Sequence, residues 1–431
     1  MNKLSKRDCL FVGITLFSMF FGAGNLIFPP FLGFQAGTSV WIAMAGFILS
    51  AVCLPILGVA AVAKSGGLDN LASRVSKKFS FIFTLLIYLS IGPCLAIPRT
   101  ASTSFEMAVT PFFSNIPYAA KIIYPLIFFA VALFLALNPE KLSDRLGKIL
   151  GPTLLILIFI IVIGCVLHSP GGYGTPTGKY TSSPVLQGFL DGYLTMDTIA
   201  ALNFGIIISL NIRNKGISDD NSVVKYIILA GLIAGALFIV VYSALAHTGA
   251  VSGGSFADAS NGAEVLTNLV SFLFGKVGII ILGLIFVIAC LNTCIGLLCC
   301  CSEYFSTITK ISYKSWLFIF TIASFFISIA GLNAILAISV PVLNALYPIS
   351  IVLIALGLFN GFFKKFKYSY PCAITFTAVV SIIYALNSIK PTPVIEAVLT
   401  KIPPYNLDLC WIIPAVAGTV LGIILSSVKK S

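Results

Sequence analysis

The chain has 431 residues, of which 58% are hydrophobic and only 9% are charged. A soluble domain carries about 25% charged and about 45–50% apolar residues, so this composition excludes a globular soluble protein and predicts an integral membrane protein. The net charge of +12 would suggest nucleic-acid binding in a soluble protein, but in a membrane protein it is first a matter of topology.

Twelve apolar runs follow one another along the chain. A helix that crosses the hydrocarbon core of a bilayer needs about 20 mainly apolar residues, and run ends are defined to about two to four residues. The basic start imitates a signal peptide, but apolar character resumes at Leu26, so we expect no cleavage. The predicted membrane spans are residues 9–35, 39–63, 79–102, 121–138, 146–167, 185–210, 223–247, 277–302, 315–331, 335–361, 370–387 and 409–427.

The basic residues indicate how these spans are oriented, because cytoplasmic loops carry an excess of Lys and Arg. With a cytoplasmic N-terminus, all but a few of the 26 basic residues lie on the cytoplasmic side. An added or missing span would reverse every later loop and remove this bias. We therefore predict a multi-pass protein of the plasma (inner) membrane with both termini in the cytoplasm and no nucleic-acid partner. The basic residues predicted in the outer half are Arg99, Lys121, Lys179, Lys276, Lys390 and Lys401.

The first span is interrupted by residues that disfavour a continuous helix. Gly22, Ala23 and Gly24 allow the backbone to leave the helix, and Asn25 can cap the second half by accepting from its free N–H groups. Unwound backbone at membrane depth is tolerated where it lines a cavity or is buried in protein. The alternative is a Gly-mediated helix contact followed by a proline kink, since both residues are common in membrane helices.

The sixth span carries two carboxylates, Asp191 and Asp197, and no Lys or Arg offsets them. A carboxylate near the middle of the bilayer costs at least about 2.5–3.5 kcal/mol. We therefore predict a second break at Thr195, Met196 and Asp197. The alternative is that Asp197 merely caps a half-helix and that Asp191 lies near the outer water, and capping is compatible with lining a cavity.

The two interrupted spans begin consecutive sets of five. An odd number of spans per set gives the sets opposite orientations in the membrane. Interrupted helices at matching positions indicate an inverted-repeat transporter with its binding site at the repeat interface. The predicted fold is all-α, with 12 transmembrane helices, discontinuous helices 1 and 6, a first repeat at 1–167, a second repeat at 168–361, and two further helices at 362–431.

Several stretches are longer and richer than a generic Gly or Pro pattern. They are GAGNLIFPP (22–30), GPCLAIPRTASTSFE (92–106), GYLTMDT (192–198), ACLNTCIGL (289–297) and ISVPVLNALYP (338–348). In these motifs and their order the chain resembles the bacterial branched-chain amino acid:cation symporters, the BrnQ-type carriers, over nearly its whole length. The resemblance implies uptake of leucine, isoleucine and valine driven by Na⁺ or H⁺, and a LeuT-like five-plus-five fold.

A zwitterionic substrate suits the two breaks. The half-helix that starts near Asn25 presents free N–H groups and a positive dipole to a carboxylate. Carbonyl groups freed at the two breaks would accept from the ammonium, and apolar side chains would surround the aliphatic group. The expected substrate-binding residues are Gly22, Ala23, Gly24, Asn25, Thr195, Met196 and Asp197.

The resemblance also implies a cation site between the first and eighth helices, because LeuT-like folds hold a sodium ion there. Sodium prefers hard oxygen ligands. The expected ligands are the carbonyl of Ala289, the side chain of Asn292 or Thr293, and carbonyls near Ser18 and Phe21. Asn and Thr stand where a pair of hydroxyl residues is more usual, so Na⁺ and H⁺ are alternatives. Thr293 has its own alternative, a hydroxyl bonded back to its own helix.

Arg99 is expected in the outer half of the third span. There it either serves in a gate, paired with Asp191 or Glu106, or extends to the outer interface. No cofactor is expected besides the coupling ion, since the Cys residues lie mostly in apolar runs and His168 and His247 stand apart. The sequence indicates no oligomeric state.

Three other functions compete with this interpretation. A channel would be expected to have continuous helices around a wide pore. An intramembrane enzyme with Asp191 and Asp197 as its acid and base is disfavoured, because six helical residues place them about 9 Å apart. A carrier of the same fold for another small neutral amino acid or a nucleobase is the nearest rival. We therefore expect a transporter and not an enzyme.

Overall fold

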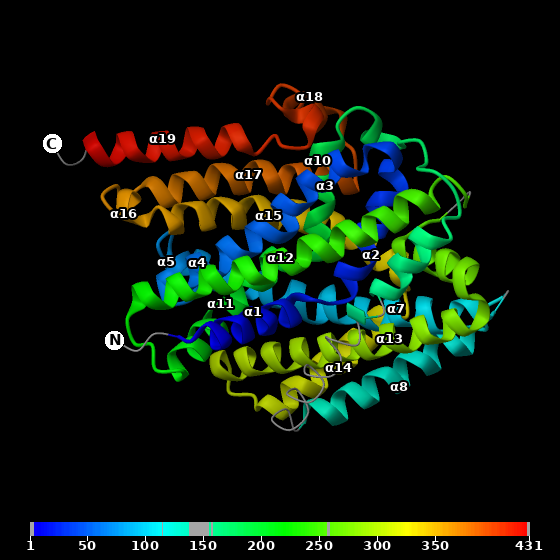
Figure 1. The fold of residues 1–431 in the computed structure, drawn as a ribbon. Helices are drawn as coiled ribbons and strands as arrows, with labels where there is room; N and C mark the ends of the chain where they lie inside the picture. The colour runs from blue at the N-terminus through cyan, green and yellow to red at the C-terminus, as the bar shows by residue number, and fades with distance from the viewer. Residues whose placement is uncertain (1–3, 114, 138–154, 157, 257–258, 429–431) are drawn as a thin grey trace.

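Helices form all the regular structure in the described part of the chain. The computed structural model describes residues 4–113, 115–137, 155–156, 158–256 and 259–428, and no strand occurs among them. Most of the long helices lie side by side and run along one direction (Figure 1). A helix satisfies its own backbone hydrogen bonds, which is why lipid-embedded chains adopt it. The predicted all-α class is confirmed.

The helices coincide closely with the predicted apolar runs. The α-helices are α1 (Lys6–Phe20), α2 (Ala23–Ala36), α3 (Val40–Ile48), α4 (Leu54–Ser65), α5 (Leu68–Ser73), α6 (Lys77–Leu89), α7 (Ala96–Ala108), α8 (Tyr118–Ala136), α10 (Pro184–Asp191), α11 (Asp197–Asn214), α12 (Asp220–Ser252), α13 (Gly262–Ile308), α14 (Tyr313–Ser328), α15 (Leu332–Leu358), α16 (Asn360–Phe363), α17 (Ser369–Ile389), α18 (Pro393–Leu399) and α19 (Ile412–Val428). Short helical turns are η1 (Gly37–Ser39), η2 (Leu49–Cys53), η3 (Ser90–Cys94), η4 (Thr110–Phe112), η5 (Gly178–Thr181), η6 (Gly192–Thr195) and η7 (Tyr405–Leu407).

The fifth predicted span, 146–167, is only partly described. Residues 146–154 and 157 lie outside the described residues, and Ile158–Leu167 is an apolar helix. Within the described residues, seven helical stretches are long and apolar enough to cross a membrane, and Ile158–Leu167, Tyr313–Ser328 and Ile412–Val428 are shorter apolar helices. The stretch Ala23–Ser65 joins the second half of the first predicted span to the second span, and α1 and α10 are too short to count by themselves. Twelve spans therefore stay a prediction.

Both expected helix breaks are present. The first lies between α1 and α2, where Phe21 and Gly22 have extended backbone angles. The second lies between α10 and α11, where η6 is followed by Met196 in the left-handed region at φ 67°. In each case a predicted span is therefore two helices that meet inside the bundle.

The third predicted span, 79–102, lies within the apolar helical stretch Lys77–Phe112, but it is also interrupted, and this break was not predicted from the sequence. The π-helical turn η3 separates α6 from α7, and Gly92 within it has φ −91° and ψ −129°. Pro93 has no N–H to donate and clashes with the preceding turn, which breaks a helix. The first turn of α7, which carries Arg99, consequently starts a new helix at Ala96.

The two broken spans pack on each other's neighbours. The helices α1 and α2 pack on α12, whereas α10 packs on α3 and α11 packs on α4. Small residues allow the backbones to touch at these contacts: a Cβ added to Gly249 of α12 would lie 1.9 Å from the carbonyl oxygen of Pro30 in α2. A Cβ added to Gly188 of α10 would lie 2.0 Å from the carbonyl oxygen of Ala43 in α3.

Polar contacts place several helix ends at one end of the bundle. Lys215, after α11, donates to Asp8 at the start of α1 over 2.9 Å. Lys64, in the last turn of α4, donates to the carbonyl of Leu358 at the end of α15 over 2.8 Å. The start of α1 and the end of α19 both lie at the left of Figure 1, as an even number of crossings requires.

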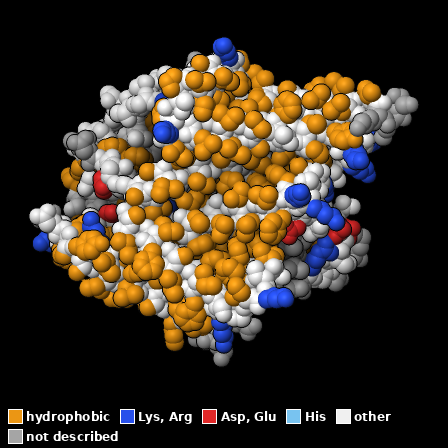
Figure 2. Space-filling view, turned by 180° about the vertical axis from the view of Figure 1, so that it is seen from behind, with side chains coloured by type: hydrophobic (Ala, Val, Ile, Leu, Met, Phe, Trp, Pro, Cys, Tyr) orange, Lys and Arg blue, Asp and Glu red, His pale blue; other side chains and the backbone are white. Residues whose placement is uncertain are grey.

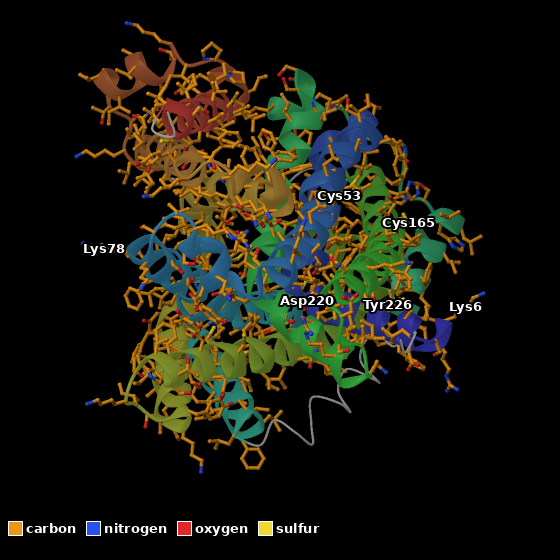
Figure 3. All side chains as sticks on the ribbon, turned by 90° about the vertical axis from the view of Figure 1, so that its left-hand side faces the viewer. Lys6, Cys53, Lys78, Cys165, Asp220 and Tyr226 are labelled. Carbon is orange, nitrogen blue, oxygen red and sulfur yellow. The ribbon has the colours of Figure 1, made fainter. Side chains whose placement is uncertain are left out.

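The surface is divided between an apolar middle and charged margins. Figure 2 shows hydrophobic side chains over most of one face, with several Lys and Arg side chains near its right-hand edge, the end that holds both termini in Figure 1. Viewed from that end, Lys6 and Lys78 lie on opposite sides of the molecule (Figure 3). This distribution suits a protein surrounded by lipid between two charged surfaces.

Substitution of Gly249 tests the backbone contact between α2 and α12. Because the added side chain meets a backbone carbonyl, we expect Gly249→Val to lower the free energy of unfolding by about 1–3 kcal/mol or more. The measurement is the thermal unfolding midpoint of the protein purified in detergent. Gly361→Val in α16 is the control, since a Cβ there meets nothing within 4 Å; equal midpoints for the two variants would contradict the packing described.

Candidate functional site

A hydrogen-bonded trio joins the two helix breaks. The side-chain nitrogen of Asn25, in the first turn of α2, donates to Oδ2 of Asp197, the first residue of α11, over 2.6 Å. The same nitrogen donates to the hydroxyl of Tyr242 in α12, and this hydroxyl lies 3.3 Å from the same carboxylate oxygen and donates to it. Asn25 is 2% exposed and Asp197 is 3% exposed. A buried carboxylate requires such donors, because an unpaired one is costly.

The expected cap at Asn25 has a different form in the structure. The helix α2 begins at Ala23, so Asn25 is its third residue and does not start it. Its side-chain oxygen accepts from the backbone N–H of Gly22 over 3.0 Å. The prediction placed the cap three residues too late, at Asn25 and not at Gly22, because only Phe21 and Gly22 leave the helical conformation.

Asp197 does not serve as a helix cap, so that alternative is wrong. The residue that precedes α11 is Met196. The hydroxyl of Thr195 donates to the carbonyl of Gly192 over 2.9 Å, which tightens the turn before the break. The carboxylate of Asp197 is thereby left for side chains of other helices, and it accepts from α2 and α12.

Arg99 lies at the break before α11, and its expected role in a gate stays a prediction. It is 5% exposed, donates from Nη1 to the carbonyl of Leu194 over 2.7 Å, and lies over the ring of Phe28 at 5.4 Å from the ring centroid. A Cβ added to Gly24 would lie 2.8 Å from its Nη2. The pairing with an outer carboxylate and the interfacial position are both wrong, because the break in the third span turns Arg99 into the interior.

Asp191 belongs to a separate contact. It accepts from the hydroxyl of Tyr180 and from the side chain of Gln187, the latter over 2.8 Å. Tyr180 lies in η5, within the predicted outer loop. Asp191 thus fastens this loop to α10, and the structure does not bring it together with Arg99.

A cavity of about 1050 Å³ connects the break to one end of the bundle. Ligand pockets commonly measure about 300–1,000 Å³. Its lining includes all seven expected substrate-binding residues together with Arg99. It extends past Phe11 of α1 to Glu303 and Tyr313, the end of α13 and the start of α14. The cavity therefore reaches toward the end of the bundle at which the chain begins.

The expected cation ligands lie around the same break but are not all directed to one point. Ser18, Asn292 and Thr293 line the cavity. Thr293 lies against the joint, since a Cβ added to Gly22 would be 3.1 Å from its hydroxyl oxygen. That hydroxyl donates to the carbonyl of Ala289 over 3.2 Å, which is the bond back to its own helix that the sequence left as an alternative.

Two contributors to the site were missed in the sequence. Tyr242 lies in a mainly apolar span, and nothing in its local pattern indicates that α12 passes the break. The carbonyl of Leu194 is a backbone group, visible only once the break has formed. The Gly92–Pro93 pair was the available signal for the interruption that buries Arg99.

Comparisons with known proteins identify relatives along the whole chain. A family model described as "Branched-chain amino acid transport protein" matches residues 5–429. The branched-chain amino acid transport system 2 carrier protein of Pseudomonas aeruginosa is 40% identical over 427 residues, which cover 98% of this chain and 97% of the relative. The branched-chain amino acid permease BrnQ of Bacillus subtilis is 41% identical over 432 residues, which cover 99% and 98%. These relatives are named as a carrier and a permease and not as enzymes.

Solved structures of Mhp1 share the fold. The closed conformation of this nucleobase-cation-symport-1 family transporter, with bromovinylhydantoin bound, superimposes with a TM-score of 0.60 at 15% identity, covering 96% of this chain and 91% of that one. The inward facing conformation of Mhp1 gives a TM-score of 0.65 at 12% identity, covering 98% and 91%. At such identity the likeness concerns the fold alone.

Removal of Asn25 tests the trio. Asn25→Ala takes one donor from the buried carboxylate of Asp197 and the acceptor from the N–H of Gly22, so we expect the free energy of unfolding to fall by about 1–3 kcal/mol. Thermal unfolding in detergent measures it. The control is Asn70→Ala, since Asn70 is exposed and donates only to a carbonyl of its own helix region. A midpoint for Asn25→Ala no lower than that of the control would show that the trio does not hold the breaks together.

Proposed function

The chain belongs to the branched-chain amino acid transport protein family, and from this membership we propose that it is a secondary transporter that imports leucine, isoleucine and valine by symport with a cation. The proposed route alternates access to one site, the cavity between the two helix breaks. A multi-pass membrane protein with a buried carboxylate and a buried guanidinium at such an interior point suits this task, because intramembrane ionisable residues mark transport paths.

One observation carries the proposal: two broken helices meet, through Asn25 and Asp197, at the inner end of a cavity that extends toward one end of the bundle. Discontinuous helices that face each other near the middle of the membrane are where secondary transporters bind substrates and coupling ions. A channel would be expected to have continuous helices around a wide pore, whereas here two helices are interrupted at the same point.

The lining of the cavity supports an amino acid with an aliphatic side chain. Polar groups gather at the breaks, and apolar side chains lie beside them on α1, α11 and α13, with Phe20, Phe204 and Ile295 among them. The start of α2 presents N–H groups and a positive dipole to a carboxylate. An aliphatic side chain removed from water among these apolar groups contributes about 25 cal/mol for each Å² buried.

We assign the coupling cation to the space between α1 and α13. Ser18, Asn292 and Thr293 offer oxygen atoms there, and the last carbonyl groups of α1, up to Phe21, have no partner within their own helix. Oxygen ligands of this kind suit Na⁺. For Na⁺ to use the Ala289 carbonyl, the Thr293 hydroxyl must turn away from it.

The exchange of packing partners supports a repeat related by inversion. The first broken span packs on α12 of the second half, and the second broken span packs on α3 and α4 of the first half. This is the pattern expected when residues 1–167 and 168–361 are inverted copies that share one site. If the two broken spans and the helices on which they pack rocked together against α7 and α13, the site would open to either side of the membrane in turn.

The first test is uptake by the full chain in proteoliposomes. Leucine, isoleucine, valine, alanine and uracil are offered under an inward Na⁺ gradient and, separately, an inward H⁺ gradient. We expect accumulation of the three branched-chain amino acids under one of the two gradients, and little of the others. Accumulation of alanine or uracil instead would contradict the proposed substrates and assign a different one. No accumulation of any compound under either gradient would refute the transporter proposal.

The second test alters the joint. In Gly24→Val the new side chain meets the guanidinium of Arg99, which the Leu194 carbonyl holds in place, so we expect uptake to be abolished while membrane insertion persists. Uptake per inserted protein is the measurement. Gly172→Val is the matched control, since a Cβ at Gly172 meets nothing within 4 Å. Near-normal uptake by Gly24→Val would show that the break between α1 and α2 is not part of the transport site.

A further inference from the structure

We propose that Arg99 is the carboxylate ligand of the transported amino acid and that Asp197 receives its ammonium group, so that a pair of opposite charges across the breaks selects zwitterions. This inference rests on the proposed function and adds to it a charged substrate ligand from the third span. Both side chains line the same cavity, and Arg99 donates to the carbonyl of Leu194, three residues before Asp197.

Arg99 has hydrogen-bonding capacity to spare. A guanidinium carries five N–H donors, and one bond, from Nη1 to the carbonyl of Leu194, is found for it among the described residues. No carboxylate of the described part of the chain lies within 4.0 Å of it. A buried cation requires pairing, and a carboxylate that enters the cavity can supply both charge and acceptors in the planar geometry that Arg favours.

The surroundings of the guanidinium reinforce an anion site. Its Nη2 lies against Gly24, in the first turn of α2. The N-terminus of a helix carries partial positive charge and free N–H groups, so the guanidinium and the helix end place like charge side by side. Such an arrangement is unfavourable alone and becomes favourable when an anion lies between them.

Asp197 provides the complementary half. Asn25 and Tyr242 both donate to its Oδ2, and these two bonds fix the orientation of the carboxylate. In the proposed complex Oδ1 accepts from the substrate ammonium. The carbonyl of Leu194, which Arg99 holds, lies three residues before Asp197 on the same break, so the break itself links the two charged groups.

The arrangement makes a specific demand on the substrate. Leucine carries both charged groups on the same carbon atom, whereas leucinamide lacks the carboxylate and 4-methylpentanoate lacks the ammonium. Each analogue leaves one buried charge of the pair unmatched, which lowers affinity by about 10- to 100-fold. If Arg99 only held the Leu194 carbonyl in place, its loss would weaken all three ligands alike.

The experiment measures how strongly unlabelled leucine, leucinamide and 4-methylpentanoate displace labelled leucine from the purified full chain. It is done in buffers with and without Na⁺. Wild type is expected to prefer leucine to both analogues by about 10- to 100-fold. In Arg99→Gln we expect the ratio of the affinity for leucine to that for leucinamide to fall toward one. In Asp197→Asn we expect the ratio of the affinity for leucine to that for 4-methylpentanoate to fall toward one. Arg99→Lys, which keeps the charge and loses the planar fork, should lie between.

Arg213→Gln is the matched control, because Arg213 is partly exposed and pairs with the exposed Asp220; its preferences should equal those of wild type. An unchanged leucine-to-leucinamide preference in Arg99→Gln, or a wild type that binds leucinamide as well as leucine, would overturn the inference. Where Arg99→Gln does not give folded protein, Arg99→Lys and the wild-type preference decide. Wild type that binds no leucine at all would instead refute the proposed function.

Discussion

The bond between Asn25 and Asp197 is the interaction on which the interior of this protein depends. It joins two helices that each stop within the bundle, and it gives a buried carboxylate a donor where lipid and apolar side chains offer none. Tyr242 adds a third helix to the same point. The two breaks are thus stable together, since each supplies the partner that the other lacks.

Close backbone contacts surround this polar point. Glycines such as Gly249 and Gly188 bring α12 against α2 and α10 against α3. In lipid, where apolar side chains gain nothing by leaving the solvent, such contacts of small residues supply much of the attraction between helices. The polar trio is consequently enclosed by tightly packed pairs, and the cavity that reaches it extends toward the end of the bundle that holds the end of α13 and the start of α14.

The interruption of the third span gives the site its one buried cation. Gly92 and Pro93 end α6, and α7 restarts with Arg99 in its first turn, where the guanidinium reaches the Leu194 carbonyl. Three broken helices therefore meet, with a cation from one, an anion from another and a helix N-terminus from the third. This combination is the physical basis of our proposal that the site takes a small molecule carrying both charges.

The sequence by itself determined the all-α membrane class, the position of most helices and the two breaks, because composition, apolar run length and Gly, Pro or Asp in apolar runs are local properties. The residues of these two breaks were likewise found in the sequence, because Gly, Asn and Asp stand out in an apolar run, whereas the break at Gly92 and Pro93 was not predicted. The tertiary structure alone decided that Asn25 bonds to Asp197, that Tyr242 joins them, that Asp191 accepts from Tyr180 in the segment before α10, and that Arg99 lies at the break before α11. These are contacts between helices far apart in the chain, and a periodic apolar sequence does not specify which faces meet. They follow only when the breaks, the close glycine contacts and the paired charges are satisfied at once.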